Sequence, residues 1–292
     1  MPLVNSDDIL RCARENRFAV GAFNADNMEM VQAIIEVANE ERAPVIVQIA
    51  PRTIDYAGLA SISNIVKAEA SEVDVPVVLH LDHGVSYEQN ITCLCHGFTS
   101  LMFDGSGLSF INNVKQTAEI VRTAHTVGIP VEAELGKVLQ ANSNAEHVVD
   151  SMTDPDQASE FVKLTGCDSL AIAVGSVHRQ KERNTELDIE RIRAIRDKVS
   201  VPLVLHGSSG VKHDCLVAAI ENGLSKINVG TYLKQGFIGK LRKTLDAMPD
   251  EVDLRMLLAP AKEETKERVR EKIRLFGASN KITASGTLRD SY

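Results

Sequence analysis

Short apolar, β-branched runs recur along the whole chain, and each is followed by a longer stretch with helical periodicity. This alternation is typical of repeated strand–helix units built on a parallel sheet. Eight runs can be counted, and eight units favour a closed barrel over an open doubly wound sheet, which usually has fewer strands. The runs are FAVGAF (18–23), PVIVQI (44–49), PVVLHLD (76–82), SLMFD (100–104), PVEAEL (130–135), SLAIAV (169–174), PLVLHG (202–207) and KINVGT (226–231).

The segments between these runs have the apolar spacing of helices that pack on a sheet. Residues 27–41, 110–128 and 188–200 carry apolar side chains at i, i+3, i+4 and i+7. No linker rich in Gly, Ser or Pro divides the chain. We therefore expect residues 1–292 to form a single α/β domain, a (β/α)₈ TIM barrel, with a charged helical C-terminal extension from about Pro260 to Phe276.

Charge and composition narrow the class of function. The chain has 292 residues, 44% of them hydrophobic, and a formal net charge of −8, which disfavours nucleic-acid and anionic-membrane partners. No apolar run approaches the roughly 20 residues that span a bilayer, and the N-terminus lacks a signal-peptide pattern. The five scattered cysteines fit buried thiols in a reducing compartment. These features predict a cytoplasmic enzyme of small molecules.

Three histidines follow predicted strands at comparable positions: His83 after the third, His178 after the sixth and His206 at the end of the seventh. The C-terminal ends of barrel strands face one common site, so the three imidazoles are expected to converge. Neutral imidazoles beside carboxylates suit Zn²⁺ and leave a coordination position open for substrate. The sequence therefore predicts a catalytic zinc site, although a single histidine at a strand end would more often be structural.

Carboxylates accompany these histidines at the same end of the predicted barrel. Asp82 ends the third run, Asp104 ends the fourth, and the fifth carries Glu132 and Glu134. His80 lies two residues before Asp82, deeper in the barrel, where a hydrogen-bonded core histidine is expected. The remaining histidines fall in helices or loops and are not expected to bind metal: His96, His125, His147 and His213.

The turn Gly207–Gly210 after the seventh run and the segment Asn228–Thr231 at the end of the eighth indicate a phosphate site. Barrels often bind phosphate at this place through backbone N–H groups. Glycine allows the backbone to approach closely, and the hydroxyls of Ser and Thr add donors.

Taken together, these segments resemble the class II, zinc-dependent ketose-bisphosphate aldolases, a family that includes fructose- and tagatose-bisphosphate aldolases. The resemblance covers nearly the whole chain. Its motifs are AFNADN (22–27), LHLDHG (79–84), DGS (104–106), VEAELG (131–136), GSVH (175–178), LVLHGSSG (203–210), KINVGT (226–231) and LFGASNK (275–281).

The resemblance implies cleavage of a phosphorylated ketose to dihydroxyacetone phosphate and an aldehyde. Zn²⁺ would be the cofactor, with a monovalent cation as a further candidate, and Asp104 and Glu134 would line alternative metal positions beside the three histidines. Asp82 would donate a proton to the aldehyde carbonyl, and Asn228 would contact the enediolate. The residues expected to bind the substrate and its phosphate are Asn24, Gly207, Ser209, Gly230 and Thr231.

The sequence departs from the family pattern at three places, which makes the substrate non-standard. The loop after the fifth strand lacks the expected acidic base, and Glu146 is the nearest downstream carboxylate. Arg52 and Arg179 stand where the family usually has glycine. Arginine suits a carboxylate, phosphate or sulfonate, so either could bind the distal end of an unusual substrate, and either could equally be a plain surface residue.

Two other functions stay open from the sequence. The missing loop acid is compatible with a metal-dependent epimerase or isomerase that uses the same enediolate, and a non-catalytic sugar-phosphate-binding protein would keep the same ligands. The resemblance also implies a homodimer or homotetramer, for which the charged C-terminal helix is a candidate interface.

Overall fold

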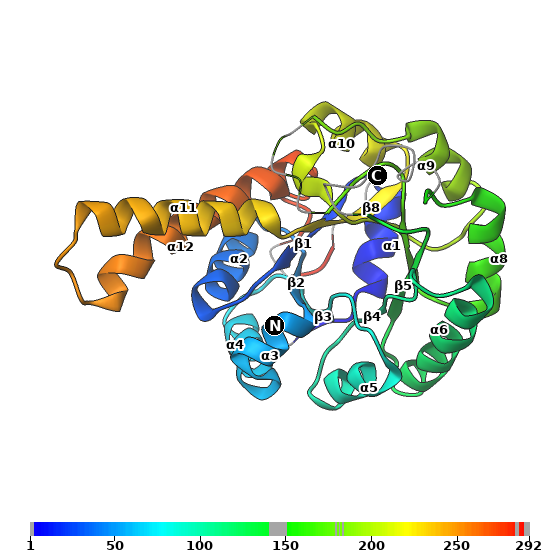
Figure 1. Ribbon diagram of the computed structural model, residues 1–292, viewed down its shortest axis with the longest axis horizontal. Helices are drawn as coiled ribbons and strands as arrows, with labels where there is room; N and C mark the ends of the chain where they lie inside the picture. The colour runs from blue at the N-terminus through cyan, green and yellow to red at the C-terminus, as the bar shows by residue number, and fades with distance from the viewer. Residues whose placement is uncertain are drawn as a thin grey trace.

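Eight parallel strands alternate with helices around a barrel in the computed structural model (Figure 1), which describes residues 3–139, 151–178, 180, 182, 184–283 and 286–288. The predicted TIM barrel is confirmed. The strands are β1 (Val20–Asn24), β2 (Val45–Ile49), β3 (Val77–Leu81), β4 (Leu101–Phe103), β5 (Val131–Leu135), β6 (Ser169–Ile172), β7 (Leu203–Leu205) and β8 (Leu224–Val229).

The strand ladder runs in the order β3-β2-β1-β8-β7-β6-β5-β4. Between β3 and β4 the barrel is joined by isolated bridges, which pair His80 with Ser100 and Gly84 with Phe103. The N–H of Asp104 donates to the carbonyl of Gly84 at 2.9 Å across the same seam. This seam lies directly beneath the residues that the sequence assigns to metal binding.

Prolines precede four of the strands, as the sequence pattern predicts. Pro44, Pro76, Pro130 and Pro202 each lie one residue before a strand begins. Proline has no N–H but keeps its carbonyl. The carbonyls of the last three prolines accept hydrogen bonds from the first or second residue of a neighbouring strand: Val45, Leu101 and Leu170. Neighbouring strands are therefore hydrogen-bonded at the start of the barrel although the prolines have no N–H to donate.

The strands β6 and β7 each end two residues before their apolar runs do. β6 ends at Ile172 and β7 at Leu205, because the chain turns away from the ladder near glycines in the left-handed region: Gly175 has φ +105 and Gly207 has φ +68. These turns place His178 and His206 above the barrel mouth or at its rim.

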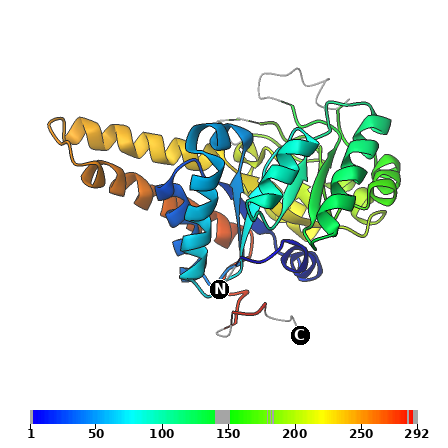
Figure 2. The same cartoon turned by 90° about the horizontal axis from the view of Figure 1, so that it is seen from below.

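The helices surround the barrel, and α1 closes its opposite end (Figure 2). Arg14 of α1 donates hydrogen bonds to the carbonyls of Arg196 and Val199, just before β7. The helices are α1 (Asp7–Glu15), α2 (Met28–Glu40), α3 (Pro51–Ala57), α4 (Leu59–Ser71), α5 (Tyr87–Cys95), α6 (Phe110–His125), α8 (Pro155–Thr165), α9 (Ile189–Arg196), α10 (His213–Glu221), α11 (Thr231–Ala247) and α12 (Leu254–Leu275), with a 3₁₀ turn, η1 (Ser208–Gly210).

The helices α11 and α12 form a hairpin that extends away from the barrel (Figures 1 and 2). The expected start of the last helix at Pro260 is wrong, because α12 begins at Leu254, where the side chain of Asp253 caps it by accepting from the N–H of Arg255. Pro260 lies inside the helix. The carbonyl left without its usual donor belongs to Met256, a residue that is 53% exposed and open to water.

Within the described residues, no helix is both long and apolar enough to cross a membrane.

Candidate metal and substrate site

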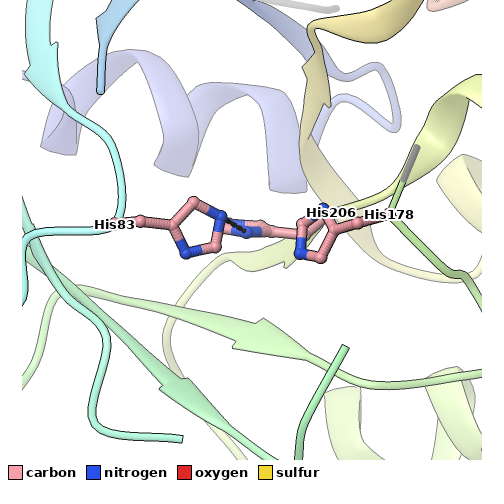
Figure 3. Close-up of side chains that lie close together, drawn as sticks. All are labelled: His83, His178 and His206. Atoms are coloured by element: carbon pink, nitrogen blue, oxygen red, sulfur yellow. Dashed lines mark hydrogen bonds between the residues drawn. The ribbon is translucent and has the colours of Figure 1, made fainter. Parts of the chain in front are cut away.

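The three histidines predicted as ligands converge at the mouth of the barrel (Figure 3). Their ring centroids lie 4.7 Å apart for His83 and His206, 5.3 Å for His83 and His178, and 6.1 Å for His178 and His206. Nδ1 of His206 lies 3.1 Å from Nε2 of His83. Two nitrogens bound to one tetrahedral zinc at about 2.05 Å would be about 3.3 Å apart. The spacing therefore fits a shared cation.

His83 occupies a backbone conformation that is unusual for a residue with a side chain. Its φ is +54, in the left-handed region. Nδ1 of His83 lies 2.8 Å from Oδ2 of Asp104, which leaves Nε2 facing His206. Backbone strain of this kind is often held at functional sites. Here it aims the imidazole into the mouth of the barrel.

Glu134 places a second set of oxygen atoms beside the histidines. Its Oε2 is buried and, among the described residues, has no hydrogen-bond partner. The same atom lies 3.7 Å from Nδ1 of His206 and 3.9 Å from Nδ1 of His83. With Asp104 and His83, Glu134 forms a second group of potential ligands. A buried carboxylate oxygen without a donor is costly unless it finds a cation or water, so the donor set fits a divalent metal ion.

The electrostatics of the site also favour a cation. Burial lowers the pKa of His83, but the carboxylates of Asp82 and Asp104 outweigh burial and raise the pKa to about 10. Burial, together with the other two imidazoles, lowers the pKa of His178 to about 3. His83 thus lies in a strongly negative field, whereas His178 resists protonation. A metal ion would neutralise the negative field of the carboxylates and would bind His178 in its neutral form.

Two side-chain amides orient Asp82 next to the histidines. Nδ2 of Asn24 donates to Oδ2 of Asp82 at 2.7 Å, and Nδ2 of Asn228 donates to Oδ1 at 3.3 Å. Burial raises the pKa of Asp82, but nearby positive groups, His83 foremost, lower it overall. Asn24, predicted to contact substrate, therefore also fixes the carboxylate. The Oδ1 atom of Asn228 is buried without a partner among the described residues.

The predicted phosphate residues lie together at the N-terminus of α11. Oγ of Ser209 accepts from the N–H of Tyr232 at 3.3 Å, which joins η1 to the first turn of α11. Thr231 begins this 17-residue helix, and Gly230 precedes it without a side-chain cap. A Cβ on Gly230 would lie 2.7 Å from Oδ1 of Asn24. Glycine at this position therefore lets the end of β8 approach the side chain of Asn24.

Comparison with known proteins agrees with this geometry. The family described as "Fructose-bisphosphate aldolase class-II" matches residues 4–281. The chain belongs to this family. It is accordingly a class II aldolase, a carbon–carbon lyase of carbohydrate metabolism.

Relatives align over nearly their full length. A protein of Bacillus subtilis named "Probable fructose-bisphosphate aldolase" is 41% identical over 285 residues, which cover 96% of this chain and 99% of the relative. The fructose-bisphosphate aldolase of Thermus caldophilus is 40% identical over 304 residues, which cover 94% of this chain and 98% of the relative. The crystal structure of the YdjI aldolase from Escherichia coli K12 is 36% identical, covers 96% of this chain and 99% of that one, and superposes with a TM-score of 0.84.

Among the positions where the sequence departs from the aldolase pattern, the described residues include Arg52. Arg52 is exposed and lies in the first turn of α3. Glu146 and Arg179 lie outside the described residues. The segment that leads to Glu146 is fixed at its start, because the carbonyl of Leu139 accepts from the N–H of His178 at 2.7 Å.

One buried contact below the three histidines involves a residue to which the sequence pattern gave no role. Lys226 is 1% exposed inside the barrel, and its Nζ lies 2.7 Å from Oε2 of Glu132. Oε1 of Glu132 in turn lies 2.9 Å from Nε2 of His206. A lysine within an apolar strand run is unusual, because buried lysines need a partner. That signal was present in KINVGT, but it did not identify the partner.

Proposed function

We propose that this protein is a zinc-dependent aldolase that reversibly cleaves a phosphorylated ketose to dihydroxyacetone phosphate and an aldehyde. The observation that carries the proposal is the convergence of three histidines beside Asp82, a buried carboxylate oriented by Asn24 and Asn228. A ligand set for a metal ion and a positioned acid–base group thus occur in one barrel mouth.

His83, His178 and His206 would hold the zinc ion, and Asp104 and Glu134 would offer an alternative position. A bound zinc ion supplies Lewis-acid polarisation of the substrate carbonyl. A monovalent cation is a further candidate cofactor.

Asp82 would deliver a proton to the aldehyde oxygen when the carbon–carbon bond forms and remove it when the bond breaks. The amides of Asn24 and Asn228 hold both carboxylate oxygens, so the carboxylate stays aimed at one place. The Oδ1 atom of Asn228, which has no partner among the described residues, is available to a substrate hydroxyl.

The phosphate would bind where η1 meets the start of α11. The backbone of Gly207 and Gly230 and the hydroxyls of Ser209 and Thr231 are the proposed donors. Support comes from the helix N-terminus itself, since its first N–H groups and its dipole favour an anion.

The proposed general base is Glu146, because the segment that leads to it begins beside His178. Arg52, exposed on α3, is proposed with Arg179 to bind an anionic group at the distal end of the substrate. A longer or acidic sugar phosphate, or tagatose bisphosphate, is therefore proposed as a substrate on an equal footing with fructose 1,6-bisphosphate.

A panel of ketose phosphates, assayed for release of dihydroxyacetone phosphate, tests the proposal. We expect turnover of at least one substrate, loss of turnover after chelation and recovery on addition of Zn²⁺. If no ketose phosphate is cleaved by the zinc-loaded protein, the proposed activity is wrong. Recovery with Mn²⁺ or Co²⁺ but not with Zn²⁺ would refute zinc as the cofactor.

Solvent deuterium separates the remaining alternatives. Deuterium that enters a ketose phosphate without carbon–carbon cleavage would indicate epimerisation or isomerisation. Binding without exchange or cleavage would indicate a non-catalytic sugar-phosphate-binding protein. Glu146→Ala is expected to slow exchange into dihydroxyacetone phosphate if Glu146 is the base, whereas unchanged exchange would assign the base to another group.

We further propose a cytoplasmic homodimer or homotetramer. No disulfide joins any of the five cysteines, as expected in a reducing compartment. The end of the α11–α12 hairpin exposes Val252 (88%) and Leu254 (67%), and such apolar positions favour self-association. Light scattering is expected to give a multimer that Val252→Asp weakens, while Val127→Asp, at an apolar position outside the hairpin, does not.

A further inference from the structure

A continuous line of buried polar groups runs through the barrel below the proposed metal site. From the closed end it passes from Ser6 to Ser100, with 2.9 Å between the two Oγ atoms, and from Ser100 to His80, whose Nδ1 lies 2.8 Å from Oγ. Nε2 of His80 lies 3.4 Å from Nζ of Lys226. Lys226 then contacts Glu132, which meets His206. All are buried, at 4% exposure or less.

The chemistry of these groups fixes the direction of the hydrogen bonds that run from Ser100 to His206. The ammonium of Lys226 has donors but no acceptor, so Nε2 of His80 accepts and its Nδ1 carries the hydrogen that is donated to Ser100. Oε2 of Glu132 accepts from Lys226. Glu132 forms a buried ion pair with Lys226, so both oxygens of its carboxylate are acceptors.

The nitrogen of His206 that faces Glu132 must therefore carry a hydrogen. Nε2 lies 2.9 Å from Oε1 of Glu132, while Nδ1 faces Nε2 of His83 at 3.1 Å. A neutral imidazole has one N–H and one lone pair. With the hydrogen on Nε2, the lone pair of Nδ1 is directed at the place where the three imidazoles converge.

We infer that Lys226 and Glu132 are positioning residues that lock His206 in the Nε2–H tautomer and so make Nδ1 its metal-binding atom. Metal-binding histidines commonly donate their other N–H to a carboxylate, and loss of that partner typically lowers metal affinity about 10- to 100-fold. Lys226 keeps the carboxylate charged in a place where no water reaches it. The inference rests on the proposed metal site.

A glutamine at position 132 would reverse the polarity of this contact. Because Lys226 offers only donors, the amide of Glu132→Gln would turn its oxygen towards Lys226 and its NH₂ group towards His206. Nε2 of His206 would then become an acceptor, and Nδ1 would carry the hydrogen that blocks the metal. Removing the lysine as well, in Glu132→Gln/Lys226→Met, frees the amide to turn back.

The first test measures the tautomer directly in the metal-free wild-type protein. Two-bond ¹H–¹⁵N correlation spectra of ¹⁵N-histidine-labelled protein distinguish protonated from unprotonated ring nitrogens, and the His206 signals are assigned by their loss in His206→Gln. We expect hydrogen on Nε2 and none on Nδ1. Hydrogen on Nδ1 would overturn the inference, and this result does not depend on the folding of any Glu132 variant.

The second test measures zinc affinity by competition with a chromophoric chelator, in variants whose fold is verified by circular dichroism. Glu132→Gln and Lys226→Met are each expected to bind Zn²⁺ about 10- to 100-fold more weakly than the wild type. The double variant is expected to bind more tightly than Glu132→Gln, which a purely structural role would not produce. Ser100→Ala is the matched control. It removes a buried polar group of the same line that does not contact Glu132 or His206, and it should leave the zinc affinity unchanged.

The proposed metal site and the proposed positioning role of Glu132 and Lys226 would be refuted by different results. If the wild type binds no divalent ion, the metal site is wrong, and the tautomer spectrum still tests the inference about His206. If the wild type binds Zn²⁺ but folded Glu132→Gln binds it equally well, or the double variant binds no better than Glu132→Gln, the metal site stands and the positioning role is refuted.

Discussion

At the scale of single residues, Asp82 combines burial with two amide donors, and this makes it the group whose loss should separate catalysis from metal binding. Asp82 is 5% exposed and is not among the clustered potential ligands. We expect Asp82→Ala to lower kcat about 10²- to 10⁴-fold, the usual contribution of general acid–base catalysis. Zinc content, measured by atomic emission, should match the wild type. A variant with kcat within tenfold of the wild type would remove Asp82 from the chemistry.

His80 should make the folded protein sensitive to acid. Burial and then the charge of Lys226 lower its pKa from 6.5 to about 3. As pH falls below 6.5 the unfolded chain takes up a proton that the folded chain refuses, so the free energy of unfolding falls by about 1.4 kcal/mol per pH unit from this residue, down to about pH 3. The contribution is fully present above pH 6.5.

Urea unfolding of the metal-free protein at several pH values measures this effect. The substitution His80→Gln preserves an acceptor for Lys226 and a donor for Ser100 but cannot be protonated. Its stability should depend less steeply on pH between 6.5 and 4 than that of the wild type. Parallel curves for the two proteins would mean that another group carries the acid sensitivity.

At the scale of elements, the sequence predicts which residues lie at strand ends, but not which side chains of distant strands meet inside the barrel. His83 and His206 were assigned because each follows an apolar run, and the ends of barrel strands share one face. The pairing of Lys226 with Glu132 links β8 to β5, two strands that are not neighbours in the sheet. Only the closed barrel brings these interior side chains to one height, so the sequence pattern could not reveal the pair.

Helix α11 contains two glycines that make a matched experiment. A Cβ on Gly236 would lie 2.1 Å from Nε of Arg268, whereas a Cβ on Gly239 would meet nothing within 4 Å. Arg268 lies 4.4 Å from the centroid of the Tyr232 ring and donates to the Tyr232 carbonyl at 2.9 Å, so it joins α12 to the start of α11.

Gly239→Ala should raise the free energy of unfolding by about 0.5–1 kcal/mol, because alanine loses less backbone entropy in a helix. Gly236→Ala has the same favourable effect on backbone entropy but displaces Arg268. The hydrogen bond and the cation–π contact of Arg268 together contribute about 1–2 kcal/mol. Gly236→Ala should therefore be about 1–2 kcal/mol less stable than Gly239→Ala in denaturant unfolding. Equal stabilities would show that Arg268 moves aside without cost.

At the scale of the whole molecule, the proposed metal lies above the place where the strand ladder is interrupted. His83 follows β3 and contacts Asp104 after β4, so the two sides of the seam meet through the ligand set itself. His206 follows β7, on the far side of the barrel mouth. A cation shared by these residues would tie together strands that backbone hydrogen bonds connect only sparsely at the seam.

Metal removal should accordingly loosen the seam more than the rest of the barrel. A ligand that binds only the folded state stabilises it by RT ln(1 + [L]/Kd), about 2.7 kcal/mol at 100-fold excess over Kd, so chelation should lower the unfolding temperature. Hydrogen exchange, followed by mass spectrometry, should rise most in peptides that cover 79–84 and 100–104. The β1–β8 ladder, where Val20 pairs with Lys226 through to Phe23 with Val229, is the internal reference. If chelation speeds exchange equally in both regions, the metal stabilises the barrel as a whole and does not close its seam.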